Sequence, residues 1–240
     1  MTAIEVKDLV ISYRPLNNVS IQKDLFRRKK KSKPFIAVNH VSFEVEQGEI
    51  LGLIGRNGSG KSTILKAIAG VFTPDSGTID LKGQSVALLS IGVGFKPEMT
   101  GRENIYIAGL LLGFSKAAIR EKEEAIVEFA EIGDFIDMPV KTYSSGMYSK
   151  LAFAITAMLE TDIILIDEVL SVGDERFKKK SYEKMKELIN SRERTVVVVS
   201  HSLSTLKELC SRVLWLNDGE IVKIGDTDEI LEEYQKYMRK

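Results

Sequence analysis

Alternating apolar and polar positions characterise the N-terminal part of the chain. In residues 35–46 the apolar side chains of Val41, Phe43 and Val45 are separated by polar ones, and a Gln-Gly turn ends the run. This alternation is typical of a strand that buries one face. Three segments are expected to form an antiparallel β layer, namely 3–12, 35–46 and 76–90 (SGTIDLKG and QSVALLS).

Continuous apolar runs follow a different pattern and predict a different sheet. They are short, rich in β-branched residues and bounded by polar positions, as expected for parallel strands covered on both faces. The four runs are EILGLIG (49–55), DIILIDE (162–168), TVVVVS (195–200) and RVLWLN (212–217). Asp218–Gly219 follows the last run and predicts a tight hairpin turn.

Residues 100–160 carry mostly helical spacing. Ser115 is positioned to cap one helix, and Ser144 or Ser145 to cap another that continues into the apolar run ending at Ile155. Ser and Gly at such a helix start leave backbone amides for an anion. We expect one domain, 1–240, with these approximate parts: a β part with a phosphate loop (1–90), a helical part (91–160), a return to the core (161–225) and a C-terminal helix (226–240).

Composition narrows the class of protein. The 240 residues include 34 basic and 34 acidic side chains, so net charge gives no indication of nucleic-acid binding, and no nucleic-acid partner is expected. The N-terminal MTAIEVKDLV does not have the pattern of a signal peptide. The apolar runs are shorter than the roughly 20 residues that span a bilayer. We therefore expect a soluble chain that reaches a membrane only through a partner.

The segment GRNGSGKST matches the phosphate-loop pattern G-x-x-x-x-G-K-[ST]. It follows an apolar strand and precedes the helical ILKAIAG, a context that disfavours an ordinary Gly-rich turn. Glycines allow the backbone amides to curl around phosphate, Lys61 reaches the β- and γ-phosphates, and the Ser62 hydroxyl ligates Mg²⁺. The residues of this loop are Gly55, Arg56, Asn57, Gly58, Ser59, Gly60, Lys61, Ser62 and Thr63.

A second chemical signal stands at the end of DIILIDE. Asp167 can hold Mg²⁺ through water, and Glu168 can polarise an attacking water as a general base. Alone, an apolar run ending in Asp-Glu is more often a strand leaving the core. Together with the phosphate loop, it predicts binding and hydrolysis of a nucleoside triphosphate.

These residues, with YSSGM ahead of them, resemble the ATP-binding cassette family. Four residues correspond to the family's signature motif, which precedes Asp167 by about 20 residues: Ser144, Ser145, Gly146 and Met147. Ser171 and Asp174, in SVGD, resemble the D-loop, and His201 resembles the switch histidine. Tyr13 is placed like the aromatic residue that stacks on adenine. The resemblance extends from about residue 3 to 225.

The resemblance implies an α/β P-loop NTPase fold with a RecA-like parallel core, an N-terminal antiparallel β subdomain and an inserted helical subdomain. It implies ATP and Mg²⁺ as cofactors. In this family two cassettes pair head to tail, so Ser144 and the amides of Ser145 and Gly146 would bind the γ-phosphate of ATP held by the partner. His201 and Glu168 would position the attacking water.

One position departs from the family pattern. The family places a glutamine between the two subdomains, where it contacts Mg²⁺ and the membrane partner, but this chain has no Gln from 85 to 234. The corresponding position falls near Ser90. A serine there would coordinate the metal through water and has a shorter reach.

YSSGM, IGVGFKPEMTGRENIY and the insertion at 14–34 resemble the branch of the family that exports polysaccharides and teichoic acids. That branch pairs two ATPase chains with two membrane permease subunits at the cytoplasmic face of the membrane. Teichoic acid is favoured over O-antigen or capsule as cargo, because the insertion at 14–34 resembles the teichoic-acid members and because this sequence ends too early for the carbohydrate-binding domain that follows the cassette in some O-antigen members. The basic run 23–33 is either a solvated loop or a contact with anionic lipid or with the permease.

Other classes remain as alternatives. Cassettes that act in DNA repair or on ribosomes usually need a long coiled coil or two phosphate loops in one chain, and neither pattern is present in this sequence. A cassette that drives another cargo would differ only in its partner. An unrelated P-loop kinase would leave YSSGM without a role.

Overall fold

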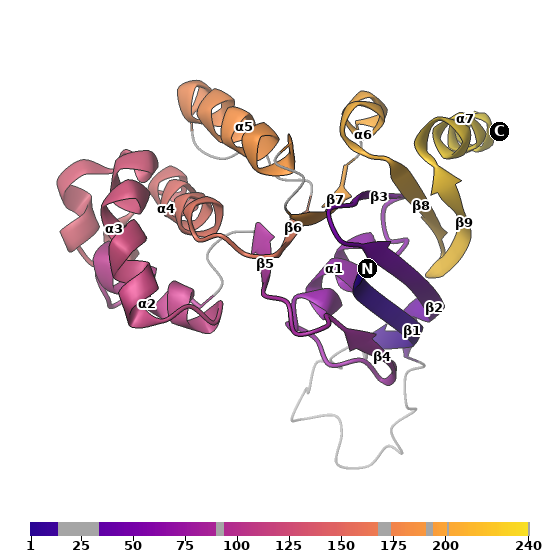
Figure 1. Ribbon diagram of the computed structural model, residues 1–240, viewed down its shortest axis with the longest axis horizontal. Coiled ribbons are helices and arrows are strands. Elements are labelled where there is room, and N and C mark those ends of the chain that lie inside the picture. The colour runs from indigo at the N-terminus through magenta and orange to yellow at the C-terminus, as the bar shows by residue number, and fades with distance from the viewer. Residues whose placement is uncertain (14–33, 90–93, 168–173, 191–193, 201, 240) are drawn as a thin grey trace, which may run out of the picture.

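The computed structural model describes residues 1–13, 34–89, 94–167, 174–190, 194–200 and 202–239. They form two sheets, a set of helices on the larger sheet and a helical unit at one end (Figure 1). Within these residues, none of the helices has the length and apolar character required to cross a bilayer.

The smaller sheet is antiparallel and has the strand order β2-β1-β4. Its strands are β1 (Thr2–Tyr13), β2 (Phe35–Glu46) and β4 (Ser76–Asp80). In β2 the side chains of Val41, Phe43 and Val45 are buried and the residues between them are exposed. The predicted alternation therefore sets which face of this sheet meets the core.

The larger sheet has the order β5-β6-β7-β3-β8-β9. Its strands are β3 (Ile50–Ile54), β5 (Val86–Leu89), β6 (Ile163–Asp167), β7 (Thr195–Val199), β8 (Arg212–Asn217) and β9 (Glu220–Asp226). All neighbours are parallel except the hairpin of β8 and β9. Asp218 and Gly219 turn this hairpin with positive φ angles of 49° and 83°, as the Asp-Gly pair predicts.

Helices cover both faces of the larger sheet. Helix α1 (Lys61–Ile68) packs in the apolar core that the two sheets share. The other face is covered by α5 (Glu175–Asn190), α6 (Leu203–Leu209) and α7 (Thr227–Met238), which run along the top of Figure 1. Burial on both faces explains why the parallel strands are continuously apolar.

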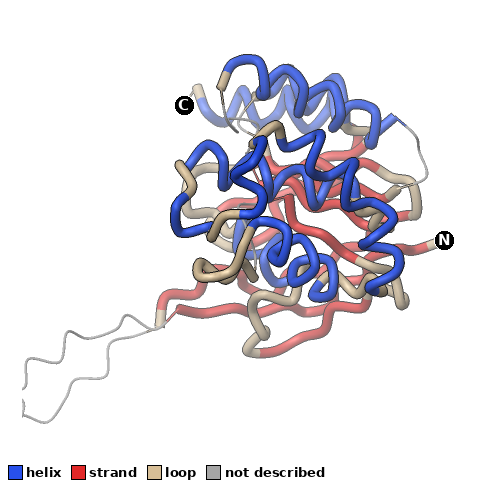
Figure 2. The backbone as a smooth tube through the Cα atoms, turned by 90° about the vertical axis from the view of Figure 1, so that its left-hand side faces the viewer, coloured by secondary structure: helices blue, strands red, loops and turns tan. Residues whose placement is uncertain are grey.

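The helical unit contains α2 (Gly101–Leu111), α3 (Lys116–Ala130), α4 (Ser145–Met158) and two short 3₁₀ helices, η1 (Gly133–Asp137) and η2 (Val140–Thr142). It has its own apolar core, which includes Ile105, Ile119, Ile126 and Leu151. From the side, this unit lies in front of the strands (Figure 2).

The predicted α/β architecture is confirmed, and so are the helix starts at Ser115 and Ser144. One prediction is wrong. The sequence pattern places QSVALLS in the antiparallel layer, but β5 pairs in parallel with β6 at the edge of the larger sheet. Only the SGTID part of 76–90 joins the antiparallel sheet.

Candidate functional site

The phosphate loop connects β3 to α1, and three glycines give it its shape. Gly55, Gly58 and Gly60 have positive φ angles of 155°, 83° and 101°. A Cβ on Gly55 would overlap the Leu216 carbonyl oxygen, and one on Gly60 would overlap the Ala37 carbonyl oxygen. Side chains at these positions would therefore strain the turn and push it away from the neighbouring strands.

Lys61 fills the centre of this loop. Its side chain is buried, and its ammonium donates to the carbonyl oxygens of Gly55 at 2.8 Å and Arg56 at 2.9 Å. Gly60 stands at the N-cap of α1 and offers no capping side chain. A buried cation at the uncapped, positive end of a helix is a favourable environment for phosphate.

Two oxygen ligands meet beside the loop. The Ser62 hydroxyl donates to a carboxylate oxygen of Asp167 across 2.9 Å. Asp167 ends β6, two strands away from β3, so the parallel sheet brings these residues together at the carboxyl ends of its strands. Hydroxyl and carboxylate oxygens are ligands that Mg²⁺ prefers, and the pair fits a Mg²⁺–phosphate group.

The loop also retains an unused donor. Ser59 is 3% exposed, and its hydroxyl has no hydrogen-bond partner among the residues that the structure describes. Buried hydroxyls are normally satisfied. A phosphate oxygen bound in the loop would suit such a group.

A cavity of about 500 Å³ opens beside the loop. Tyr13 stands at its rim, 38% exposed, with its hydroxyl 3.1 Å from the Thr63 hydroxyl and its ring edge-on to Phe72. The lining residues are Tyr13, Phe35, Ala37, Asn57, Gly58, Gly60, Lys61, Ser62, Thr63 and Val199. The cavity is thus lined both by the polar phosphate loop and by the aromatic side chains of Tyr13 and Phe35.

Sequence reasoning missed three of these lining residues, namely Phe35, Ala37 and Val199. Phe35 lies directly opposite Tyr13 in the pairing of β1 with β2. The register of this pair would have identified Phe35, but the 21 residues between them conceal that register in the sequence.

The signature segment, Ser144–Met147, begins α4. The Ser144 hydroxyl accepts from the amide of Met147 at 3.2 Å, as an N-cap does. Ser144 and Ser145 are exposed, and a Cβ on Gly146 would meet only the Ser144 hydroxyl, at 3.8 Å. Within the described part of the chain, none of these four residues lines the cavity of the phosphate loop.

Asp174 directly precedes α5 and connects its start to α4. One carboxylate oxygen accepts from the amide of Phe177 at 2.9 Å, and the other contacts the Lys150 ammonium at 2.6 Å. The hydrogen bond from Lys150 is the main cause that lowers the pKa of Asp174 to about 2. This carboxylate therefore remains charged over the whole physiological range of pH.

Four candidate residues lie outside the described residues. They are Ser90, Glu168, Ser171 and His201, and the same holds for the basic run 23–33. Their assigned roles stay predictions. The structure brings together the phosphate loop, Asp167 and Tyr13, and it places the signature segment elsewhere on the chain.

Comparison with known families agrees with this arrangement. The profile of a family described as "ABC transporter" matches residues 38–171, more than half of the chain. The chain belongs to this family. The resemblance read from YSSGM and the phosphate loop is thereby confirmed.

The relatives of this cassette include proteins named for export. A teichoic acids export ATP-binding protein, TagH, of Bacillus anthracis is 48% identical over 91% of the chain and 39% of its own length. An O-antigen export ATP-binding protein, RfbB, of Myxococcus xanthus is 41% identical over 98% of the chain and 56% of its own length. RfbB of Klebsiella pneumoniae is 42% identical over 87% of the chain and 84% of its own length. The chain thus spans about two fifths to just over half of the first two relatives.

Solved structures share the fold of this cassette. The ATP-binding subunit of an ABC transporter superposes with a TM-score of 0.75 at 24% identity, covering 98% of the chain and 94% of that subunit. A dimeric ATP-binding cassette bound to ADP and phosphate superposes with a TM-score of 0.71 at 20% identity, covering 93% of the chain and 98% of that cassette. At these identities the likeness shows the fold alone.

Proposed function

We propose that the chain binds ATP with Mg²⁺ and hydrolyses it as the nucleotide-binding subunit of an exporter. The observation that carries this proposal is the contact between Ser62 and Asp167 beside the buried Lys61. Lys61 and the loop amides from Arg56 to Thr63 bind the phosphates, while Ser62 and Asp167 hold the metal. Tyr13 stacks on adenine at the rim of the cavity.

Catalysis requires two residues that follow neighbouring strands. Glu168, next to Asp167, acts as the general base on the attacking water, and His201 contacts the γ-phosphate. Ser90 contributes to the metal site through water. Mg²⁺ supplies charge neutralisation on the phosphates when it is bound.

The complete site needs a second copy of the chain. The exposed start of α4 offers backbone amides that suit an anion, but it does not line the cavity where ATP would bind to the same chain. This start consists of Ser144, Ser145, Gly146 and Met147. In a head-to-tail homodimer it binds the γ-phosphate of the partner's ATP, with Ser171 and Asp174 at the junction. Two such chains pair with two permease subunits at the cytoplasmic face of the membrane.

The proposed cargo is a lipid-linked teichoic acid, supported by relatives named for teichoic acid export at up to 48% identity. O-antigen is the second candidate, since relatives named for its export match at 41–42%. Depletion of the chain in its host separates the two. A phosphate-rich polymer accumulating in the cytoplasm indicates teichoic acid, whereas a phosphate-free polysaccharide indicates O-antigen.

The mechanism is tested by Glu168→Gln. Loss of a general base is expected to lower ATP turnover by about a hundredfold or more. Because the site is shared, an ATP-dependent dimer should accumulate, which sedimentation with ATP and Mg²⁺ would detect. The matched control is Glu160→Gln, an exposed carboxylate paired with Lys122. Persistent turnover in Glu168→Gln would overturn the assignment of the base.

A further inference from the structure

The chain enters the signature segment through residues 138–143, which are bound along their length to residues 97–101. The amide of Val140 donates to the Met99 carbonyl and that of Lys141 to the Pro97 carbonyl, both at 2.9 Å. Gly101 donates to Met138 at 3.2 Å. The start of α4 is therefore positioned by the segment that leads into α2.

Tyr143 is the last residue before the N-cap Ser144, and its side chain turns back into the helical unit. Its hydroxyl donates to the Phe135 carbonyl oxygen in η1 at 2.7 Å. Partial burial raises the pKa of Tyr143 to about 12, so the hydroxyl stays protonated and continues to donate. The residue adjoining the signature segment is thus tied at both ends, by its backbone to Val140 and by its side chain to η1.

Gly101, the first residue of α2, leaves room for this hydroxyl. A Cβ built at Gly101 would overlap the Tyr143 hydroxyl oxygen and would lie 3.0 Å from the Ile136 carbonyl oxygen. The φ angle of Gly101 is not among the positive ones, so backbone conformation does not require glycine here. Glycine is required at this position because the Tyr143 hydroxyl occupies the space where a Cβ would lie.

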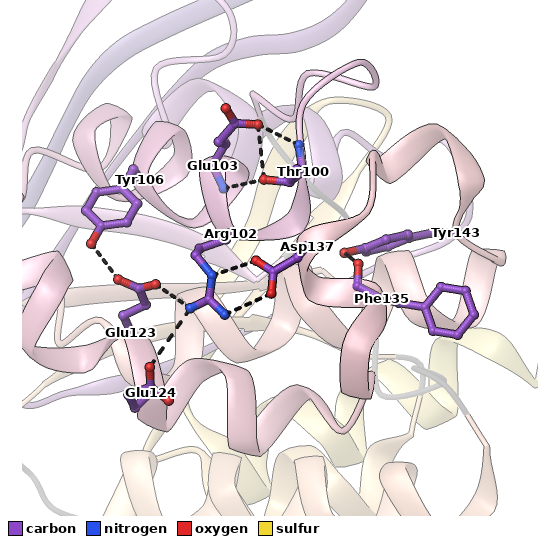
Figure 3. A network of polar contacts seen from close by, with 9 residues as sticks. All are labelled: Thr100, Arg102, Glu103, Tyr106, Glu123, Glu124, Phe135, Asp137 and Tyr143. Carbon is purple, nitrogen blue, oxygen red and sulfur yellow. Dashed lines mark hydrogen bonds and ion pairs between the residues drawn. The ribbon is translucent and has the colours of Figure 1, made fainter.

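The acceptor of the tyrosine is itself held in place. Arg102 donates through two nitrogens to the carboxylate of Asp137, at 2.8 and 3.3 Å, and through a third to Glu123 of α3 (Figure 3). Glu123 also accepts from the Tyr106 hydroxyl. Since Asp137 closes η1, this network fixes the short helix that carries Phe135.

We propose that Tyr143 is a positioning residue for ATP bound to the partner chain, acting through Ser144 at the start of α4. The phenol of Tyr143 sets where Ser144 and the first-turn amides of α4 lie. Gly101 leaves the space that the Tyr143 hydroxyl occupies. The proposal rests on the proposed function, in which the signature segment completes the partner's site.

Three variants in the Glu168→Gln background test the proposal. Tyr143→Phe removes only the hydroxyl, and Gly101→Ala fills its space. Each hydrogen bond lies within one chain, so its loss acts by letting the start of α4 move before ATP binds, and over the two sites it should raise the dissociation constant of the ATP-bound dimer by up to about tenfold. Gly101→Ala should weaken the dimer at least as much. In Gly101→Ala/Tyr143→Phe the clash with the hydroxyl is absent, so the dimer should partly recover relative to Gly101→Ala.

Two readouts separate positioning from loss of folding. Binding of a fluorescent ATP analogue to dilute, monomeric chain reports on the phosphate loop and should stay within about twofold of wild type in all variants, because Tyr143 is not in the cavity lining. Thr156→Val is the matched control, since it removes one hydroxyl hydrogen bond to a backbone carbonyl of the same helical unit, that of Ala152 at 3.0 Å, and lies outside the network that holds η1. It should leave the dimer unchanged.

The outcomes are distinct. If the reference chain binds the analogue but never forms an ATP-dependent dimer, the shared-site function fails, and this inference fails with it. If the reference chain dimerises and Tyr143→Phe dimerises equally well, only the positioning role is overturned. Equal weakening by Tyr143→Phe and Thr156→Val would also overturn it, since the effect would then belong to the helical unit as a whole.

Discussion

At the scale of single residues, Lys150 connects α4, the helix that carries it, to Asp174, the residue before α5. Its ammonium lies 2.6 Å from Asp174 and 5.2 Å from the centre of the Phe177 ring. Its own side chain is only 14% exposed, whereas that of Asp174 is 60% exposed. An exposed ion pair contributes little to stability, so its main effect is on the charge and orientation of Asp174.

Lys150→Met retains the apolar stem of the side chain and removes the charge. Because the hydrogen bond from Lys150 is the largest cause of the low pKa of Asp174, that pKa should rise from about 2 toward the ordinary value of 3.8. The folded pKa is depressed, so this group stabilises the fold above pH 3.8, and that contribution is lost as pH falls toward 2. Carboxyl NMR titration measures the change.

Lys184→Met is the matched control for this titration. Lys184 lies on α5 and, like Lys150, pairs with a carboxylate, that of Glu187 at 2.8 Å. Lys184→Met should leave the pKa of Asp174 at about 2. A pKa of Asp174 that stays at about 2 in Lys150→Met would show that the amide of Phe177 alone maintains the shift.

Residue types in the phosphate loop were predictable because their spacing reflects a backbone requirement for glycine and a single lysine. The role of Tyr143 was not, since its partner is a carbonyl oxygen whose position depends on how η1 packs. Lys150 and Phe35 were missed for the same reason. Each depends on a neighbour brought close by tertiary structure, which local patterns do not encode.

At the scale of elements, side-chain caps set the starts of α2, α3, α4, α6 and α7. Helix α2 has a complete capping box, in which the Thr100 hydroxyl accepts from the amide of Glu103 and the Glu103 carboxylate accepts from the amide of Thr100. Thr100 also bridges to Pro139 through its backbone. The cap therefore stabilises residues 97–101, which bind residues 138–143 ahead of α4.

Thr100→Ala removes the hydroxyl half of this box. Loss of an N-cap hydroxyl costs about 1 kcal/mol, which corresponds to a fall of about 2–4 °C in the melting temperature of a chain of this size. Circular dichroism during heating measures it. Thr100→Ser retains the acceptor and should melt near wild type, and an equal loss in both variants would mean that the methyl group, not the cap, is responsible.

The elements themselves were largely readable from the sequence, with β5 as the exception. Its four apolar residues, VALL, follow an antiparallel strand by six positions and lie far in sequence from their partner β6. A short apolar run indicates a strand but not its neighbour. The parallel pairing with β6 depends on the intervening helical unit, which returns the chain to the position beside the edge strand β5.

At the scale of the whole molecule, the two proposed anion sites are separate. The phosphate loop lies where β3 enters α1, while the signature segment lies at the start of α4 in the helical unit (Figure 1). Among the described residues, the cavity of the loop has no lining residue from the signature segment. In the proposed function one chain holds halves of two different sites, and a symmetric head-to-tail dimer would complete both.

This arrangement predicts complementation between two inactive chains. Lys61→Ala disables the phosphate loop, and Gly146→Asp places a carboxylate where the partner's γ-phosphate should bind. Each variant alone should hydrolyse ATP poorly. In a mixed dimer the two defects meet in one site, and the other site is intact. Random pairing makes about half of the dimers mixed, so an equal mixture should recover about a quarter of wild-type turnover.

The control for complementation is the double variant Lys61→Ala/Gly146→Asp mixed with wild type. Here every mixed dimer carries one defect in each site, so random pairing leaves about a quarter of the chains in fully intact wild-type dimers and no intact site elsewhere. If the first mixture recovers no activity although both variants fold and pair, each chain must carry a complete site of its own. The exposed start of α4 would then require another ligand.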